Sequence, residues 1–223
     1  MKKRALIVTL ILALCPAATL TQSPVESLHP SVIVKAASLL DVRKGTYLRN
    51  AAVWVEGDRI REVGSAPEIQ AHAAKNAKVI DLGKATLLPG LIDCHTHIMA
   101  RIPEEHRQAA FLQKMQDSIQ AARTLGVKIA AGFDPSSAEE HGKNATELAA
   151  MVKLGLPSLE AIQAATVNAA ELLSWQDRVG ALEPGHYADL IAVDGDPLAD
   201  IAVLQHVKFV MKGGTVVTAP RDN

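Results

Sequence analysis

Strand-like segments at both ends of the chain, separated by a helix-rich middle, are the feature that most constrains its fold. Residues 32–64 fall into short apolar runs, and Glu56-Gly57-Asp58 separates two alternating runs in the way a hairpin turn does. From Val179 onward similar runs return. Turns are expected there at Pro184-Gly185, Asp194-Gly195 and Gly213-Gly214. Each terminal segment is small for an independent domain, so we expect the two to pack together.

This pattern predicts an α/β protein with a split organisation. Residues 31–88 and 179–219 are expected to form one composite β-sandwich. Residues 89–178 are then an α/β unit inserted between the two halves of that sandwich.

The middle of the chain predicts helices and one buried strand. Apolar residues recur at helical spacing from Ala110 to Ala122, which predicts a helix of about five turns ending near Gly126. The apolar run of residues 127–134, "VKIAAGFD", is typical of a strand buried on both faces. Asn144 with Glu147 predicts the capped start of a second helix, and Ser158 predicts the start of a third.

The first residues have the pattern of an export signal. Lys2, Lys3 and Arg4 precede an apolar stretch from Ala5 to Leu14. This stretch is shorter than the roughly 20 residues that a spanning helix needs, so we expect a cleaved signal peptide over residues 1–22, no stable membrane span afterwards, and a periplasmic or secreted protein.

The two cysteines have different expected roles. Cys15 invites a lipoprotein interpretation, which we discount because Leu14 stands where a small residue is expected before a lipidated cysteine. Cys94 remains after signal cleavage, and we expect it to be a buried structural thiol without a disulfide partner in the same chain.

The charge balance argues against a nucleic-acid partner. The chain has 23 Lys and Arg against 24 Asp and Glu, and the basic residues are scattered along it. Nucleic-acid binders usually carry a clustered basic excess.

Two histidines at the end of an apolar run predict part of a metal site. His95 and His97 are two positions apart, so on a strand both imidazoles face the same side. Asp134 ends the second apolar run, and catalytic groups of parallel α/β folds gather at such strand ends. Two imidazoles and a carboxylate suit zinc or a similar divalent ion, which activates water for hydrolysis.

Four segments together resemble the amidohydrolase superfamily, in particular its imidazolonepropionase-like and Xaa-Pro dipeptidase branch. They are "LLPGLIDCHTHI", "VKIAAGFD", "HGKNATELAAMVKLGLPSLEAIQAATVNAAELL" and "VGALEPGHYADLIAVDGDPLADIAVLQHVKFVMKGG". The resemblance implies a (β/α)8 barrel with a split β-sandwich, one or two divalent ions, and hydrolysis of C–N bonds in cyclic amides or dipeptides.

The resemblance also assigns roles to individual residues. His95 and His97 match the metal-binding pair that ends the first barrel strand. Asp134 matches the carboxylate that ends the eighth strand, which binds metal and acts as general base and then acid. Phe133 departs from the usual Gly-Thr-Asp at this place.

The middle of the expected barrel is missing from the sequence. The family also uses a carboxylated lysine and two further histidines from its middle strands, but only residues 98–133 separate His97 from Asp134. One βαβ unit takes about 30 residues and a whole barrel about 250. Lys114, Lys128 and His106 lie in no segment that matches those strands. The sequence therefore predicts an incomplete barrel.

Two functions follow from these patterns. The first is a metal-dependent hydrolase acting on a small amide or dipeptide, with His141 either lining the substrate pocket or lying in a solvated loop. The alternative is a catalytically inactive remnant that binds a metal or a partner. Association of copies of the chain to close the barrel is a further hypothesis.

Overall fold

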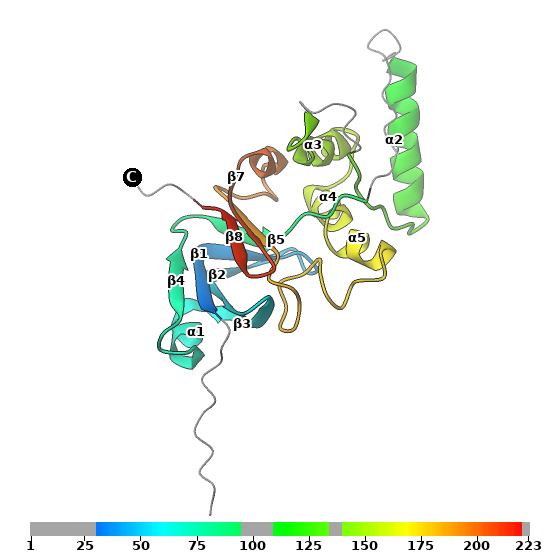
Figure 1. Cartoon of the computed structure of the whole chain (residues 1–223). Helices are drawn as coiled ribbons and strands as arrows, with labels where there is room; N and C mark the ends of the chain where they lie inside the picture. Colours follow the sequence, from blue (N-terminus) through cyan, green and yellow to red (C-terminus); the bar gives the residue numbers. More distant parts are fainter. Residues whose placement is uncertain (1–29, 95–108, 134–139, 220–223) are drawn as a thin grey trace, which may run out of the picture.

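The computed structural model describes residues 30–94, 109–133 and 140–219, and all structural statements below concern these residues (Figure 1). The strands are β1 (Ser31–Asp41), β2 (Thr46–Glu56), β3 (Arg59–Ser65), β4 (Lys78–Asp81), β5 (Thr86–Pro89), β6 (Leu190–Val193), β7 (Val207–Lys212) and β8 (Thr215–Thr218). The helices are α1 (Ala66–His72), α2 (Ala109–Thr124), α3 (Ala145–Lys153), α4 (Ser158–Ala164), α5 (Val167–Leu172) and the 3-10 helix η4 (Ile201–Gln205).

Strands from both ends of the chain form one mixed sheet. Its order is β3-β2-β1-β5-β6-β7-β8, and β4 pairs in parallel with the first half of β1. The two ends of the chain meet where β5 pairs antiparallel with β6. The expected hairpin is confirmed, since β2 and β3 pair antiparallel across Gly57-Asp58.

The sheet is curled but not closed. Arg59, at the start of the edge strand β3, forms an isolated bridge with Tyr187, just before β6. The guanidinium of Arg59 also lies 3.5 Å from the centre of the Tyr187 ring. The curl encloses a core whose largest fully buried members include Phe209, Leu87 and Leu190.

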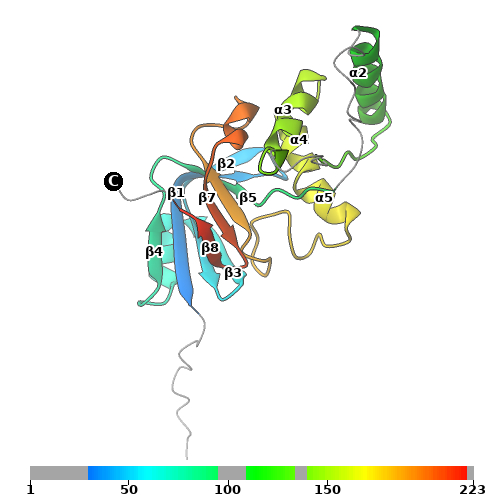
Figure 2. The same ribbon diagram turned by 45° about the horizontal axis from the view of Figure 1, so that its top comes forward.

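A second core joins the sheet to the helices. Leu40 of β1, Leu88 of β5 and Ile191 of β6 pack with Leu148 of α3 and Ile162 of α4. Figures 1 and 2 show α3, α4 and α5 grouped beside one end of the sheet. The end of β5 therefore points the chain toward these helices, and the segment after β5 carries the predicted metal-binding histidines.

Helix α2 lies on the far side of the other helices from the sheet in both views (Figures 1 and 2). Arg123 near its end donates two hydrogen bonds to the carboxylate of Glu160 on α4, at 2.7 and 2.9 Å. No helix in the described ranges is long and apolar enough to cross a membrane.

Two expectations about the middle of the chain are wrong. Residues 127–133 form no strand, because the described part of the chain supplies only isolated backbone hydrogen bonds to this segment instead of a ladder on both sides. The helix expected from Ser158 is broken into α4 and α5 at Ala165-Thr166, and Pro157 rather than Ser158 is its N-cap residue.

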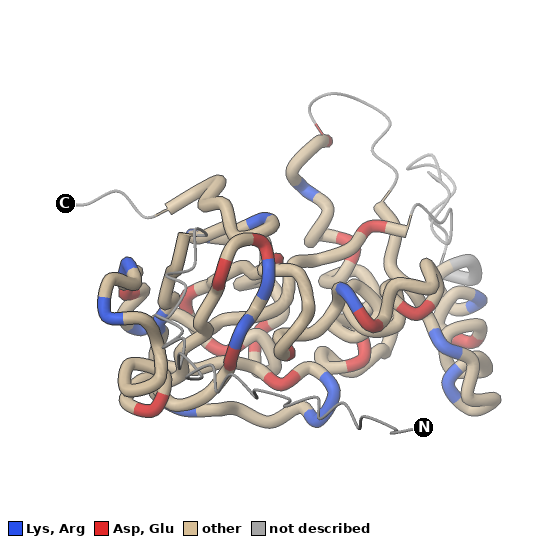
Figure 3. Tube along the Cα trace, turned by 60° about the horizontal axis from the view of Figure 1, so that its bottom comes forward, with Lys and Arg blue, Asp and Glu red and all other residues tan. Residues whose placement is uncertain are grey.

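Charged side chains of both signs are interspersed over the described part of the chain (Figure 3). Exposed ion pairs contribute to this pattern, for example Arg43 with Glu183 at 2.7 Å. Pairs of this exposure contribute only about 0–1 kcal/mol each, so the buried cores dominate the stability of the fold.

Candidate functional site

The predicted metal and acid-base residues His95, His97 and Asp134 lie outside the described residues. Within the described ranges there is no group of three or more His, Cys, Asp and Glu side chains that could hold a metal ion. The structure describes the backbone directly before these residues. Residues 90–94 precede His95, and residues 127–133 precede Asp134.

These two segments lie side by side. The Cys94 N–H donates to the Ala131 carbonyl at 2.9 Å. The Phe133 N–H donates to the Asp93 carboxylate at 3.1 Å. The sequence prediction that the two apolar runs end close together is therefore supported up to the last described residue of each run, although neither run is a strand.

The break between α4 and α5 holds both segments. The Ala165 carbonyl accepts from the Ile92 N–H at 2.7 Å, and the Ala164 carbonyl accepts from the Ala131 N–H at 2.8 Å. In a continuous helix these carbonyls would bond to N–H groups four residues further along. The break redirects them outward, so the backbone of one helix pair positions both segments of the site.

Asp93 connects the segment before His95 to the start of α3 by a hydrogen bond. Its carboxylate accepts the Phe133 N–H and also a hydrogen bond from the Asn144 side chain, at 2.6 Å. Sequence analysis predicts that Asn144 caps α3, and the structure corrects this: Asn144 stands at the N-cap position but makes no side-chain cap hydrogen bond. Its amide instead joins α3 to the segment before His95.

Glu147 is a buried carboxylate, although its spacing from Asn144 predicts a part in the helix cap. Its side chain is only 7% exposed, and its Oε1 has no hydrogen-bond partner among the described residues. Burial raises the pKa of this carboxyl, and the negative charge of Asp93 raises it further. A sequence signal exists, because Glu147, Met151 and Leu154 share one helical stripe that is otherwise apolar.

A small cavity of about 100 Å³ lies between these groups. Asp93, Phe133, Asn144 and Glu147 line it together with apolar neighbours such as Leu91 and Leu148. Its lining includes Asp93, two residues before His95, and Phe133, directly before Asp134. The smaller cavity therefore marks where the candidate site adjoins the described fold.

Cys94 is partly rather than fully buried, which corrects the expectation of a buried thiol. Its Sγ donates a weak hydrogen bond to the Ala169 carbonyl at 3.8 Å. Burial raises the pKa of the thiol, and the Asp93 charge adds to the increase. A thiol of raised pKa is a poor nucleophile, so a structural role fits it best.

His141 lies in an exposed turn before α3. It lines neither the smaller cavity nor the larger one described next. Its assignment to substrate binding stays a prediction.

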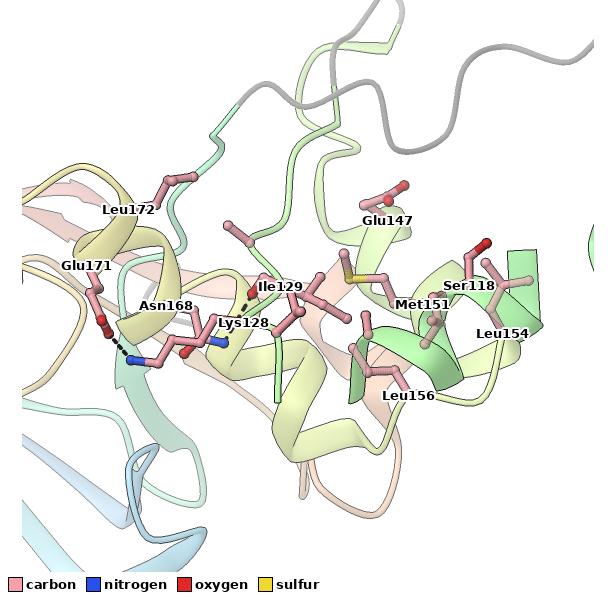
Figure 4. Close-up of a pocket in the computed structure, with 14 residues that line it drawn as sticks. Ser118, Lys128, Ile129, Glu147, Met151, Leu154, Leu156, Asn168, Glu171 and Leu172 are labelled. Atoms are coloured by element: carbon pink, nitrogen blue, oxygen red, sulfur yellow. Dashed lines mark hydrogen bonds and ion pairs between the residues drawn. The ribbon is translucent and has the colours of Figure 1, made fainter. Parts of the chain in front are cut away.

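A larger cavity of about 690 Å³ lies between α2, α3, α5 and residues 127–130 (Figure 4). Its walls are mainly apolar and include Ile119, Met151, Leu154 and Leu156. Glu147 lines this cavity as well as the smaller one. Figure 4 shows Lys128 paired with Glu171, away from Glu147.

Comparison with known proteins shows which proteins this chain is similar to. The amidohydrolase family matches residues 112–217. Ochratoxinase of Aspergillus niger is 40% identical over 120 residues, which is 50% of this chain and 24% of that protein. Imidazolonepropionase of Legionella pneumophila is 38% identical over 81 residues, which is 36% of this chain and 19% of that protein.

Solved structures show a similar fold. A Xaa-Pro dipeptidase with bound methionine in its active site superimposes with a TM-score of 0.68 at 15% identity, covering 85% of this chain and 100% of that chain. The A. niger ochratoxinase superimposes with a TM-score of 0.69 at 17% identity, covering 87% and 97%. At this identity the superpositions show likeness of fold.

Over residues 112–217 the chain is thus similar to the amidohydrolase family, which the four sequence segments also resemble. It spans about a quarter of the length of the ochratoxinase that it matches in sequence.

Proposed function

We propose that the chain is a metal-dependent hydrolase of carbon-nitrogen bonds, with His95, His97 and Asp134 as its metal-binding residues and zinc as the ion. The observation that carries this proposal is the hydrogen bonding of the two segments that lead into these residues. The Cys94 N–H donates to the Ala131 carbonyl, and the Phe133 N–H donates to the Asp93 carboxylate. The backbone segments directly before His95 and Asp134 therefore lie next to each other.

The donor set fits a divalent ion of borderline softness. Two neutral imidazoles and one carboxylate are ligands that zinc accepts, and a catalytic zinc usually keeps one position for water. Such an ion, when bound, lowers the pKa of its water and polarises the substrate carbonyl.

The chain's own residues have separate tasks in this proposal. Asp134 takes the proton of the attacking water and returns it to the leaving nitrogen. Asp93 holds the Phe133 backbone, and so fixes where the chain enters Asp134. Asn144 keeps the Asp93 carboxylate in place from α3.

The substrate class that we propose is a cyclic amide or a Xaa-Pro-type dipeptide. Relatives whose names denote an imidazolonepropionase and a Xaa-Pro dipeptidase support this class. We further propose that the curled sheet corresponds to the split β-sandwich of the superfamily, and that α2 to α5 belong to an incomplete barrel.

The test is hydrolysis of a panel of Xaa-Pro dipeptides and cyclic amides by the purified full chain. Activity should disappear after chelation, return with added zinc, and be absent from Asp134→Ala under both conditions. Glu183→Gln, which changes an exposed carboxylate that lines neither cavity, should behave as wild type. Equal activity of Asp134→Ala and wild type would reject the proposal.

A second candidate is a non-catalytic remnant that binds a metal or a partner. Exposed apolar side chains that line the larger cavity favour it: Leu172 is 60% exposed and Val127 56%. Apolar groups gathered in this way are typical of protein contact surfaces. A second copy of the chain is the partner that we propose for this case, and light scattering that shows only monomer at working concentrations would exclude it.

We also propose that the chain is exported with cleavage after a signal peptide of residues 1–22. Expression in a bacterial host followed by fractionation and mass determination of the N-terminus tests this. An uncleaved chain found only inside the cell would contradict it.

A further inference from the structure

We propose that the larger cavity binds a small molecule that carries a primary ammonium group on an apolar body, with Glu147 as the partner of the ammonium. This binding site does not depend on the proposed hydrolysis. It rests on the side chains that line the cavity, all of which are described.

The size and walls of the cavity suit a small molecule. Its volume of about 690 Å³ lies within the range of roughly 300–1,000 Å³ that is typical of ligand sites. Ile119 and Ala122 of α2 line it, as do Met151 of α3 and Leu154 directly after α3. An apolar body would therefore lose water-exposed surface against both helices.

Glu147 is the polar side chain in these walls that is left without a partner. The hydroxyl of Ser118 donates to the Lys114 carbonyl at 2.8 Å, and the Asn168 amide donates to the Ile129 carbonyl at 3.1 Å. Lys128 and Glu171 are paired with each other. Oε1 of Glu147 has no such partner in the described part of the chain, although the residue is only 7% exposed.

A buried acceptor without a partner is costly, so native structures usually satisfy it. The charges that line the cavity indicate which kind of ligand group would bond to this acceptor. Glu147 and Glu171 contribute two carboxylates against the single ammonium of Lys128, and Asp93 adds a further carboxylate on the other side of Glu147. A cation with N–H donors matches this charge, whereas an anion would be repelled.

The experiment is isothermal titration calorimetry of the full chain with hexylammonium chloride, and with 1-hexanol as a neutral probe of the same length. Wild type should bind hexylammonium more tightly than 1-hexanol. Glu147→Gln should weaken hexylammonium binding roughly tenfold or more while leaving 1-hexanol binding unchanged, because it removes a charge-assisted hydrogen bond.

A matched control makes the same chemical change outside the cavity. Glu183→Gln removes an exposed carboxylate that lines neither cavity, and it should bind hexylammonium as wild type does. Thermal unfolding of each variant checks that it is folded.

Three results would overturn the proposal. They are equal affinity of wild type for the two probes, hexylammonium affinity that Glu147→Gln leaves unchanged, and no binding of either probe to wild type. In the last case, a dimer in light scattering would show that a second copy of the chain covers the cavity instead.

Discussion

Replacing Gly180 by alanine should destabilise the protein by more than its backbone angle alone explains. Gly180 has a φ of +86°, and a Cβ built on it would lie 2.7 Å from the Ala170 Cβ and 2.8 Å from the Thr166 carbonyl oxygen. Thr166 stands at the break between α4 and α5 whose carbonyls hold residues 92 and 131. The close approach of Gly180 is thus part of what keeps the break, and the candidate site, in place.

The size of the effect has two parts. A non-glycine residue in the left-handed region costs about 1–2 kcal/mol. Forcing a methyl group against helix backbone and side chain adds about 1–3 kcal/mol of overpacking. We therefore expect Gly180→Ala to lower the free energy of unfolding by about 2–5 kcal/mol.

Gly185→Ala is the matched control. Its φ of +89° is nearly the same, but a Cβ there meets nothing within 4 Å, so only the angular cost applies. The two variants should differ by about 1–3 kcal/mol, or roughly 2–12 °C in Tm for a chain of this size. Urea and thermal unfolding monitored by circular dichroism measure this. Equal destabilisation by the two substitutions would refute the packing argument.

Three further outcomes are expected. Asp93→Ala should speed hydrogen exchange at the Phe133 amide and cost about 1–3 kcal/mol, because it removes the acceptor of both the Phe133 and Asn144 donors; unchanged exchange at Phe133 would contradict the assigned role. Arg123→Ala should lower amide protection along α2 but cost at most about 1 kcal/mol globally, since its bidentate pair with Glu160 is partly exposed; loss of more would contradict a surface role. Burial raises the pKa of Tyr47, and its hydrogen bond to Asp196 raises it further. The protonated Tyr47 side chain therefore contributes to the free energy of unfolding below about pH 10, and this contribution is lost as the pH rises above that value. Tyr47→Phe should therefore flatten the fall of unfolding free energy above about pH 10, and identical slopes there would exclude the effect.

Sequence patterns predict those elements of this chain whose structure is determined by a single local segment. The hairpin across Gly57-Asp58 and the start of α3 after Asn144 follow from turn and helix signals alone. They fail where the outcome depends on distant partners. Residues 127–133 have the composition of a buried strand, yet they form none because a strand needs a ladder that the described chain does not supply.

The candidate site shows the same division. The sequence identifies His95, His97 and Asp134, and it predicts that the segments before them meet. It does not reveal the break at Ala165-Thr166, because no glycine or proline marks it. It also assigns Asn144 and Glu147 to a helix cap, whereas tertiary contacts direct Asn144 to Asp93 and bury Glu147.

The metal content of the purified full chain shows whether His95, His97 and Asp134 form a metal site. Elemental analysis after removal of loosely bound ions should give close to one zinc or more per wild-type chain. The His95→Ala/His97→Ala double variant should retain essentially none while keeping the wild-type circular dichroism spectrum. A wild-type chain that holds no metal, or a variant that holds as much as wild type, would contradict a metal site at these residues.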